Sequence, residues 1–384
     1  MSELVILAGV DSKNFFRLRS RLIEKIRLRS RCVVFCGLRA GIDVCPPGLV
    51  VLDNGIEGGK FQWLNLLRSW VKFLFSRKRG YRIPCAAMAF GLFPSVVMVF
   101  YFFFLRPTKA ICVLTGLGKL FENGFLSAPP IRNAVIVYLL FFYQVFVVQN
   151  RSDYEYLRNK VLRFPFKRDI ELILGSGFDS SGLAKKLNTR SCDAQSSNCR
   201  ARFLYIGRFV VSKGIIDFID AAIRVVELGA AYPSQCQFTI AGFPYERSDG
   251  VSLEEIYRRI DGYEEFFTVV DGSDGVLDYL ARTDFLVSPS QREGLGLSVI
   301  EAMAFGVPVI GYDVAGINDL IIEDKTGWLV RPGDIFGLAE RIRNAAGLCK
   351  GVREEMSVQA REHFNVLGLD CVEVDRQYLE VLGL

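Results

Sequence analysis

Short apolar runs recur along the chain in two separate series, and this spacing constrains the fold more than any other feature. Each run has the length of a buried strand, and longer segments, such as the basic stretch 15–29, have a helical pattern. Such alternation predicts mostly parallel sheets covered by helices. The runs are residues 4–8, 33–35, 50–52, 110–114 and 145–148 in the first series, and 203–206, 238–241, 285–287 and 307–310 in the second.

A polar stretch rich in Ser, Asn and Arg, residues 188–202, separates the two series. The length of 384 residues suits two domains of roughly 150 to 200 residues each. We therefore predict a Rossmann-like domain at 1–175, a hinge and polar linker at 176–202, and a second Rossmann-like domain at 203–365. A C-terminal helix at 366–384 is expected to pack back on the first domain. In doubly wound sheets, ligands bind beyond the carboxyl ends of the strands.

Charge is divided unevenly between the two halves. Residues 1–175 carry 26 Lys and Arg against 11 Asp and Glu, whereas residues 176–384 carry 21 against 31. The first half is thus expected to face an anionic partner, and its many aromatic and aliphatic residues favour lipid over nucleic acid. Segment 61–82 mixes Trp, Phe and Leu with Arg and Lys, which predicts an interfacial helix on an anionic membrane surface. A core-packed helix with a solvated basic end is the alternative.

Two other apolar segments, 95–105 and 134–148, are shorter than the roughly 20 residues that cross a bilayer, so we expect them in the core.

Ten cysteines without a Cys-x-x-Cys pair favour reduced thiols and a cytoplasmic location over a disulfide or a metal site at Cys32 and Cys36 or at Cys192 and Cys199. The single histidine, His363, leaves zinc chemistry and Ser-His-Asp hydrolysis without their usual residues.

Residues 288–310 read as a strand, a glycine loop, a short helix and another strand. Gly294 and Gly296 let backbone N–H groups approach an anion closely, and a helix beginning near Leu297 adds its positive end. A diphosphate fits this arrangement. Glu293 and Glu301 flank the loop and are expected to face one pocket, with Glu301 in the first turn of the helix. Ser298 and Glu301 also have the spacing of a capping box, which is the structural alternative for Glu301.

This passage resembles the E-x7-E signature of the retaining glycosyltransferases of family four, which have the GT-B fold. The resemblance implies an α/β chain of two Rossmann-like doubly wound domains facing across a cleft. It also implies that Glu293 lies against the transferred sugar and that Glu301 hydrogen-bonds the ribose of the nucleotide.

A second block, 205–214, has Arg208 and Lys213 at the spacing of the same family. Two cations and a helix end stabilise the charge that develops on the β-phosphate of the leaving nucleotide, so no metal is required. The chain contains no Asp-x-Asp pair, which agrees with a metal-free site. We assign catalysis to Glu293, Arg208 and Lys213. The residues expected to bind the nucleotide sugar are Glu301, Gly294, Leu295, Gly296, Leu297 and Gly316.

Further blocks resemble the bacterial polysaccharide enzymes of that family, which act on polyprenyl-diphosphate-linked sugars. Segments 148–150, 175–179 and 314–316 look like a strand end, the interdomain hinge and the loop beside the donor sugar. The likeness covers about 110–335, with a weaker part at 16–22. It implies an acceptor side formed by Thr115, Gly116 and Gly118. The first domain departs from many members of the family because it has no histidine.

Taken together, these residues predict a retaining glycosyltransferase that moves a hexose or N-acetylhexosamine from a UDP- or GDP-sugar, without a metal cofactor. The expected acceptor is polyprenyl-diphosphate-linked or a polysaccharide, in the biosynthesis of O-antigen, lipopolysaccharide or capsule. The expected location is the inner face of the plasma membrane, as a peripheral protein. A sugar-nucleotide epimerase, a phosphorylase with a lysine-bound cofactor, and a non-catalytic partner subunit of the same fold are the alternatives.

Overall fold

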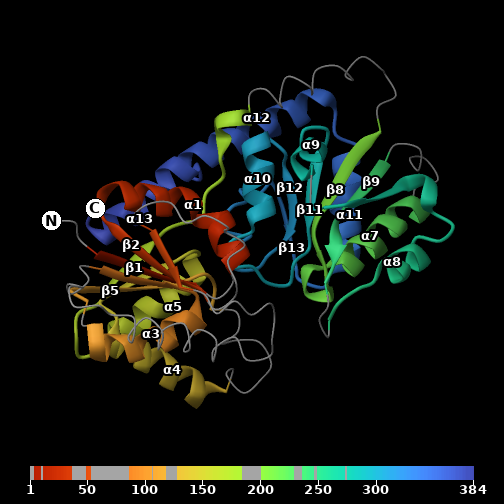
Figure 1. The fold of residues 1–384 in the computed structure, drawn as a ribbon. Coiled ribbons are helices and arrows are strands. Elements are labelled where there is room, and N and C mark those ends of the chain that lie inside the picture. Colours follow the sequence, from red (N-terminus) through yellow and green to blue (C-terminus); the bar gives the residue numbers. More distant parts are fainter. Residues whose placement is uncertain are drawn as a thin grey trace. The chain divides into compact units, whose positions relative to one another are not determined.

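The computed structural model describes residues 4–9, 12–36, 49–52, 86–105, 107–117, 128–183, 200–228, 236–245, 249–272 and 275–384. Contacts divide the chain into two compact units, which Figure 1 draws in sequence colours. Unit 1 comprises Met1–Ser176 together with Val372–Leu384, and unit 2 comprises Gly177–Cys371. The C-terminal segment therefore belongs to the same unit as the N-terminal half of the chain.

Unit 1 contains a seven-stranded sheet in the order β3-β2-β1-β4-β5-β6-β7. All neighbouring strands are parallel, and the strand order reverses between β1 and β4. A reversal of this kind is the switch point at which doubly wound sheets bind ligands. The strands are β1 (Leu4–Gly9), β2 (Arg31–Cys36), β3 (Leu49–Leu52), β4 (Ala86–Phe90), β5 (Lys109–Leu114), β6 (Val145–Val148) and β7 (Asp169–Leu172).

Helices cover both faces of this sheet because its central strands are apolar on both sides. In β4, Ala87 and Ala89 join a core with α3 (Leu92–Leu105), α4 (Pro129–Phe142) and α5 (Arg151–Val161). The alternate residues Met88 and Phe90 join a second core with α1 (Ser12–Arg29) and α13 (Cys371–Leu382). Because side chains along a strand point alternately to the two faces of the sheet, each central strand contributes residues to both cores.

Helix α13 is anchored to unit 1 by a buried arginine. The guanidinium carbon of Arg19 lies 4.8 Å from the ring centre of Phe90 and 4.5 Å from that of Tyr378, so α1, β4 and α13 meet at one side chain. Arg19 also donates a hydrogen bond of 3.2 Å to the Tyr378 hydroxyl. Between the same helices, Lys25 pairs with the buried Asp375 at 2.9 Å.

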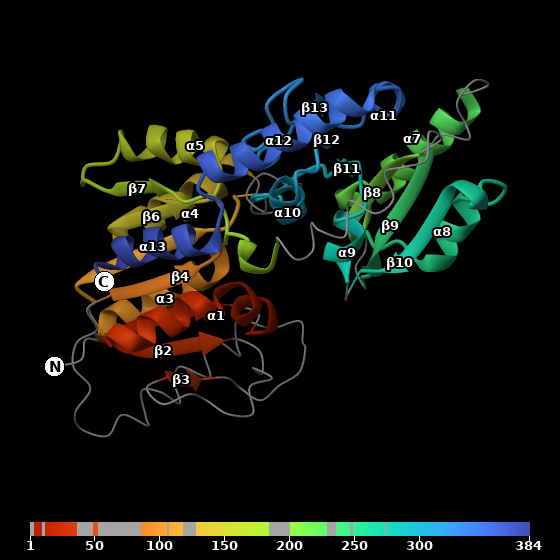
Figure 2. The same cartoon turned by 90° about the horizontal axis from the view of Figure 1, so that it is seen from above.

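Unit 2 contains a six-stranded parallel sheet in the order β10-β9-β8-β11-β12-β13, which Figure 2 shows from a second direction. The strands are β8 (Ala201–Phe209), β9 (Cys236–Pro244), β10 (Phe267–Asp271), β11 (Phe285–Ser288), β12 (Val309–Tyr312) and β13 (Gly327–Val330). The order reverses between β8 and β11, so this sheet also has a switch point. The helices are α7 (Ile215–Leu228), α8 (Leu253–Arg259), α9 (Val276–Leu280), α10 (Leu297–Phe305), α11 (Ile335–Ala346) and α12 (Lys350–Val366).

The predicted α/β architecture is confirmed, and each apolar run predicted as a strand overlaps an observed one. Four strands were missed, namely β4, β7, β10 and β13. Segment 95–105 lies in α3, and segment 134–148 comprises part of α4 followed by β6. Within the described residues, no helix has the length and apolarity needed to cross a membrane. The predicted interfacial helix at 61–82 lies outside the described residues.

Candidate active site

Three loops of unit 2 meet at the carboxyl ends of adjacent strands β8, β11 and β12. They are 210–214, 289–296 and 313–316, and they surround the switch point of the sheet. Because all six strands are parallel, their carboxyl ends share one edge of the sheet. This is the edge at which open α/β sheets bind ligands.

The loop after β8 contains a single 3-10 turn, Val211–Lys213, that ends at Gly214 in the left-handed conformation with φ +72°. A Cβ atom at Gly214 would lie 2.0 Å from the carbonyl oxygen of Pro289, so the loop after β11 packs directly on this glycine. The amide of Gln291 also donates to the carbonyl of Ser212 at 3.1 Å. Only glycine permits both this φ and this approach, which brings the two loops together.

Lys213 and Glu293 form an ion pair across the two loops. The Nζ of Lys213 lies 2.5 Å from Oε1 of Glu293, although the residues are 80 positions apart in the chain. The two side chains are 22% and 15% exposed, which leaves the pair reachable by a ligand while much of its solvent is excluded. The structure therefore joins two of the residues that the sequence assigned to catalysis.

The third, Arg208, is near the carboxyl end of β8. Its guanidinium carbon lies 4.7 Å from the ring centre of Tyr245, which directly follows β9, and this stacking restricts the side chain. The carbonyl of Arg208 accepts a hydrogen bond of 3.2 Å from the hydroxyl of Tyr205. Burial raises the pKa of Tyr205, the negative charge of Glu293 raises it further, and Arg208 opposes both. Tyr205 is therefore a neutral donor beneath the loop.

The glycine loop ends at Gly296, the residue preceding α10. Its amide donates to the carbonyl of Gly316 at 3.2 Å, and Gly316 has φ +82°. A Cβ atom at Gly316 would lie 2.7 Å from the carbonyl oxygen of Gly294 and 2.9 Å from that of Glu293, so the loop after β12 closes on the one after β11. Leu295 lies in this loop, and Leu297 is the first residue of α10. The first amides of a helix have no partner within the helix and point toward an incoming anion.

The capping-box alternative for Glu301 is wrong. Helix α10 begins after Gly296 without a side-chain cap, so Ser298 is the second helical residue rather than the capping one. Glu301 is the fifth residue of the helix, one turn farther along than the sequence suggested. The assignment of its carboxyl to the nucleotide stays a prediction from the resemblance.

The predicted acceptor-side residues lie in unit 1. Thr115 and Gly116 directly follow β5, next to the switch-point strand β4, and Thr115 is exposed. A buried carboxylate supports this loop, because Asp153 accepts hydrogen bonds of 2.9 Å from the amide of Leu117 and from the side chain of Asn150. Gly118 lies outside the described residues.

Sequence reasoning missed Tyr245 and Asp153. Tyr245 directly follows β9, so the rule that ligands bind beyond the carboxyl ends of the strands pointed to its position, but a single aromatic residue carries no motif. Asp153 lies three residues after Asn150, whose side chain accepts from the Asp153 amide at 2.8 Å as the cap of α5. The capping pattern predicts the helix start but not the bond to Leu117.

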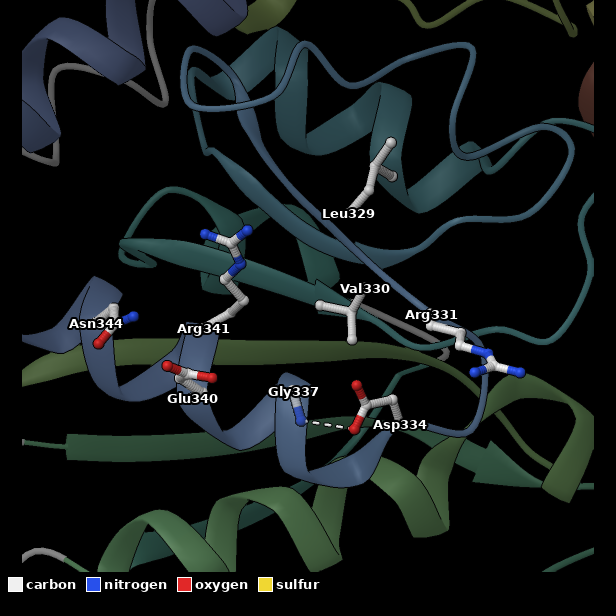
Figure 3. A pocket seen from close by; sticks show the side chains of 8 residues that line it. All are labelled: Leu329, Val330, Arg331, Asp334, Gly337, Glu340, Arg341 and Asn344. Atoms are coloured by element: carbon white, nitrogen blue, oxygen red, sulfur yellow. Dashed lines mark hydrogen bonds between the residues drawn. The ribbon is translucent and has the colours of Figure 1, made fainter.

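A cavity of about 380 Å³ lies elsewhere in unit 2, on α11 and the end of β13. Figure 3 shows Arg331, Asp334 and Arg341 around it, and Asp334 accepts a hydrogen bond of 2.8 Å from the amide of Gly337. It shares no residue with the three loops. Among the described residues, no group of three or more His, Cys, Asp and Glu side chains has the arrangement of a metal site.

The chain is similar to known glycosyltransferases. Residues 200–347 match the model of the family "Glycosyl transferases group 1". The sulfoquinovosyl transferase SQD2 of Arabidopsis thaliana is 38% identical over 98 residues, which are 25% of this chain and 19% of that protein. The putative colanic acid biosynthesis glycosyltransferase WcaL of Escherichia coli is 31% identical over 144 residues, 36% of this chain and 34% of that protein. The chain thus spans about a third or less of these two relatives.

Solved structures match over the whole chain. The sucrose-phosphate synthase of Thermosynechococcus elongatus superposes with a TM-score of 0.78 at 20% identity, covering 99% of this chain and 98% of that one. Anabaena HepE, in complex with UDP and glucose, has a TM-score of 0.70 at 16% identity and is covered completely, as is this chain. The chain therefore has the GT-B fold of glycosyltransferases, and residues 200–347 in its second unit match the group 1 family of glycosyl transferases.

Proposed function

We propose that the protein transfers a sugar from a nucleoside diphosphate donor to an acceptor with retention of the anomeric configuration. The observation that supports this most is the Lys213–Glu293 pair at the switch point of unit 2, beside the start of α10. One charged group of each sign, next to a helix N-terminus, suits a ligand that presents both a diphosphate and sugar hydroxyls. The group 1 match covers the same loops.

In the proposed reaction, the acceptor hydroxyl oxygen attacks the anomeric carbon on the face from which the diphosphate departs. The bond between the anomeric carbon and the β-phosphate oxygen breaks as the new glycosidic bond forms, and the hydroxyl proton passes to the departing phosphate. Arg208, Lys213 and the first amides of α10 stabilise the negative charge that develops on that phosphate. Glu293 accepts hydrogen bonds from sugar hydroxyls, and Glu301 holds the ribose.

For the donor, UDP-sugars are the first choice because the HepE structure contains UDP, and GDP-sugars are the second. We propose a polyprenyl-diphosphate-linked or polysaccharide acceptor in surface polysaccharide synthesis, which the likeness to WcaL supports. Thr115 and Gly116 form part of the acceptor side, and association with the inner face of the plasma membrane brings a lipid-linked acceptor within reach. Segment 61–82 is proposed to contribute to that association.

The test is release of UDP or GDP from a panel of donor sugars, measured with the wild type, Arg208→Ala and Glu301→Ala. Each variant is expected to lose about 100-fold or more in turnover, because each loses a contact to the phosphate or the ribose. Arg341→Ala and Glu340→Ala, at the separate cavity, are the matched controls and are expected to keep full activity. Wild-type turnover in Arg208→Ala and Glu301→Ala would show that the site lies elsewhere.

We further propose that transfer needs no metal ion, because two cations and a helix end are available for the leaving diphosphate. Turnover in a strong chelator is expected to equal turnover in its absence. Activity that the chelator abolishes and that magnesium or manganese restores would contradict this. An epimerase would instead convert the donor sugar without an acceptor, and product analysis distinguishes that outcome.

A further inference from the structure

An exposed apolar patch lies in unit 1, formed by one face of α4 and the loop between α5 and β7. Val137 and Phe141, one helical turn apart on α4, are 43% and 54% exposed. In the loop, Leu162 and Phe166 are 75% and 50% exposed. We call these four residues the Phe141 patch. Large exposed apolar side chains are common singly, but a group of them marks an interaction surface. The ring centres of Phe141 and Phe166 are 6.2 Å apart.

The aromatic rings of the patch pack against neighbouring rings. The ring centres of Phe141 and Phe164 are 5.0 Å apart, those of Phe164 and Phe166 are 5.7 Å apart, and both pairs meet edge to face. Arg168 stacks on Phe164 and Phe166 at 5.6 and 5.5 Å, and its side chain donates to the carbonyls of Leu140 and Phe141. These contacts hold the exposed rings of Phe141 and Phe166 in place.

Basic residues lie beside the apolar residues of the loop. Arg163 and Lys167, which alternate with the apolar residues of the loop, are exposed. Over residues 129–172, all of them described, the chain has seven Lys and Arg against four Asp and Glu; Asp153 is buried, and Asp169 and Glu171 are exposed in β7. A surface with aromatic and aliphatic tips beside basic residues complements the headgroup region of an anionic bilayer, where rings enter the interface and cations meet phosphates.

The position of the patch leaves the binding edge of the sheet open. The loop containing Leu162 and Phe166 leads into β7, and the C-terminal end of α4 leads into β6, so both lie at the amino edge of the sheet. Thr115 and Gly116 follow β5 and lie at the opposite, carboxyl edge. A bilayer at the amino edge does not cover the carboxyl edge, so this contact anchors the chain and does not itself deliver a lipid-linked acceptor to Thr115 and Gly116.

We propose that the Phe141 patch, with Arg163 and Lys167, is a contact surface for anionic lipid bilayers, separate from segment 61–82 and independent of the proposed catalytic activity. The apolar tips insert among the headgroups, and the two cations bind lipid phosphates. Lipid binding therefore requires both the apolar residues and the charges of this surface.

The experiment is flotation of the full chain with vesicles of phosphatidylcholine alone or with phosphatidylglycerol. The charge variant is Arg163→Gln/Lys167→Gln, and the apolar variant is Leu162→Ser/Phe166→Ser; both leave segment 61–82 unchanged. Partitioning onto anionic vesicles is expected to fall about fivefold for each charge removed, and therefore about 25-fold in the charge variant. The apolar variant is expected to lose at least about tenfold.

Control variants carry similar changes on exposed residues of unit 2. Leu228→Ser/Tyr257→Ser and Arg258→Gln/Lys350→Gln are expected to bind vesicles as the wild type does. Thermal unfolding and donor hydrolysis without vesicles show whether each variant remains folded. The proposal is overturned if folded patch variants keep wild-type partitioning, which would leave segment 61–82 to account for binding. It is also overturned if the wild type does not float with anionic vesicles, which would favour a protein partner.

Discussion

Replacing Lys213 with methionine separates the contribution of this side chain to stability from its contribution to turnover. Lys213→Met keeps the length of the side chain but removes the charge, so Glu293 loses its ion-pair partner at 2.5 Å. Breaking a fully buried pair costs about 3 to 5 kcal/mol, and an exposed pair is worth at most about 1 kcal/mol. Exposures of 22% and 15% lie between these cases, so we expect a loss of about 2 kcal/mol in unfolding free energy.

In Lys213→Met, the free-energy loss in turnover is expected to exceed the loss in stability. A cation removed from the developing charge of the leaving group costs about 3 kcal/mol or more, which is a factor of about 100 or more in rate. The assay measures nucleotide release at saturating donor, together with urea denaturation, for Lys213→Met, Glu293→Gln and the double variant. In the double variant, no carboxylate is left unpaired, so stability is expected to recover while turnover does not.

Two outcomes would refute this reasoning. Wild-type turnover in Lys213→Met would mean that the ammonium does not act on the diphosphate. Additive stability losses in the double variant would mean that the pair contributes no coupling energy, since interacting residues deviate from additivity by about 0.5 to 3 kcal/mol.

Three further predictions concern the surroundings of the site. Gly214→Ala places a Cβ atom 2.0 Å from a backbone oxygen at φ +72°, so it is expected to lower stability by about 1 to 3 kcal/mol or more and to abolish turnover, as urea denaturation and nucleotide release would show. Tyr245→Leu removes the ring that stacks on Arg208, so turnover is expected to fall severalfold with little change in thermal midpoint; an unchanged rate would contradict a positioning role. Burial raises the pKa of Cys112 to about 12, so at pH 8 its thiol is expected to resist alkylation until the protein unfolds, whereas exposed Cys349 reacts at once, as peptide mass spectrometry would detect.

Much of the fold was predictable because buried parallel strands are short, continuous apolar runs. Val145–Val148 and Phe285–Ser288 are of this kind, and all of their residues are buried. Strand β4 was missed because its five residues include three alanines, which favour strands weakly and resemble part of a helix. Strand β7 was missed because it lies at the edge of its sheet, where Asp169 and Glu171 are exposed and interrupt the apolar pattern.

The site was predictable only as far as local motifs reach. The glycine loop and the start of α10 follow from residues close together in sequence, so their placement near Leu297 is confirmed. The contact between Lys213 and Glu293 depends on which strands become neighbours, because β8 and β11 are adjacent only after the order of the sheet reverses. The stacking of Tyr245 on Arg208 depends in the same way on β9 pairing with β8.

The return of residues 372–384 to unit 1 has a consequence for biosynthesis. Unit 2 is one continuous stretch, 177–371, whereas unit 1 needs α13, whose Val374, Tyr378, Leu379 and Leu382 fill the core beneath α1. Translation delivers every residue of unit 2 before it delivers α13. Unit 1 therefore cannot complete its core until residues 372–384 have been made, although most of it emerges much earlier. During that interval α1 and β4 expose an apolar face, which is when a chaperone would bind the nascent chain.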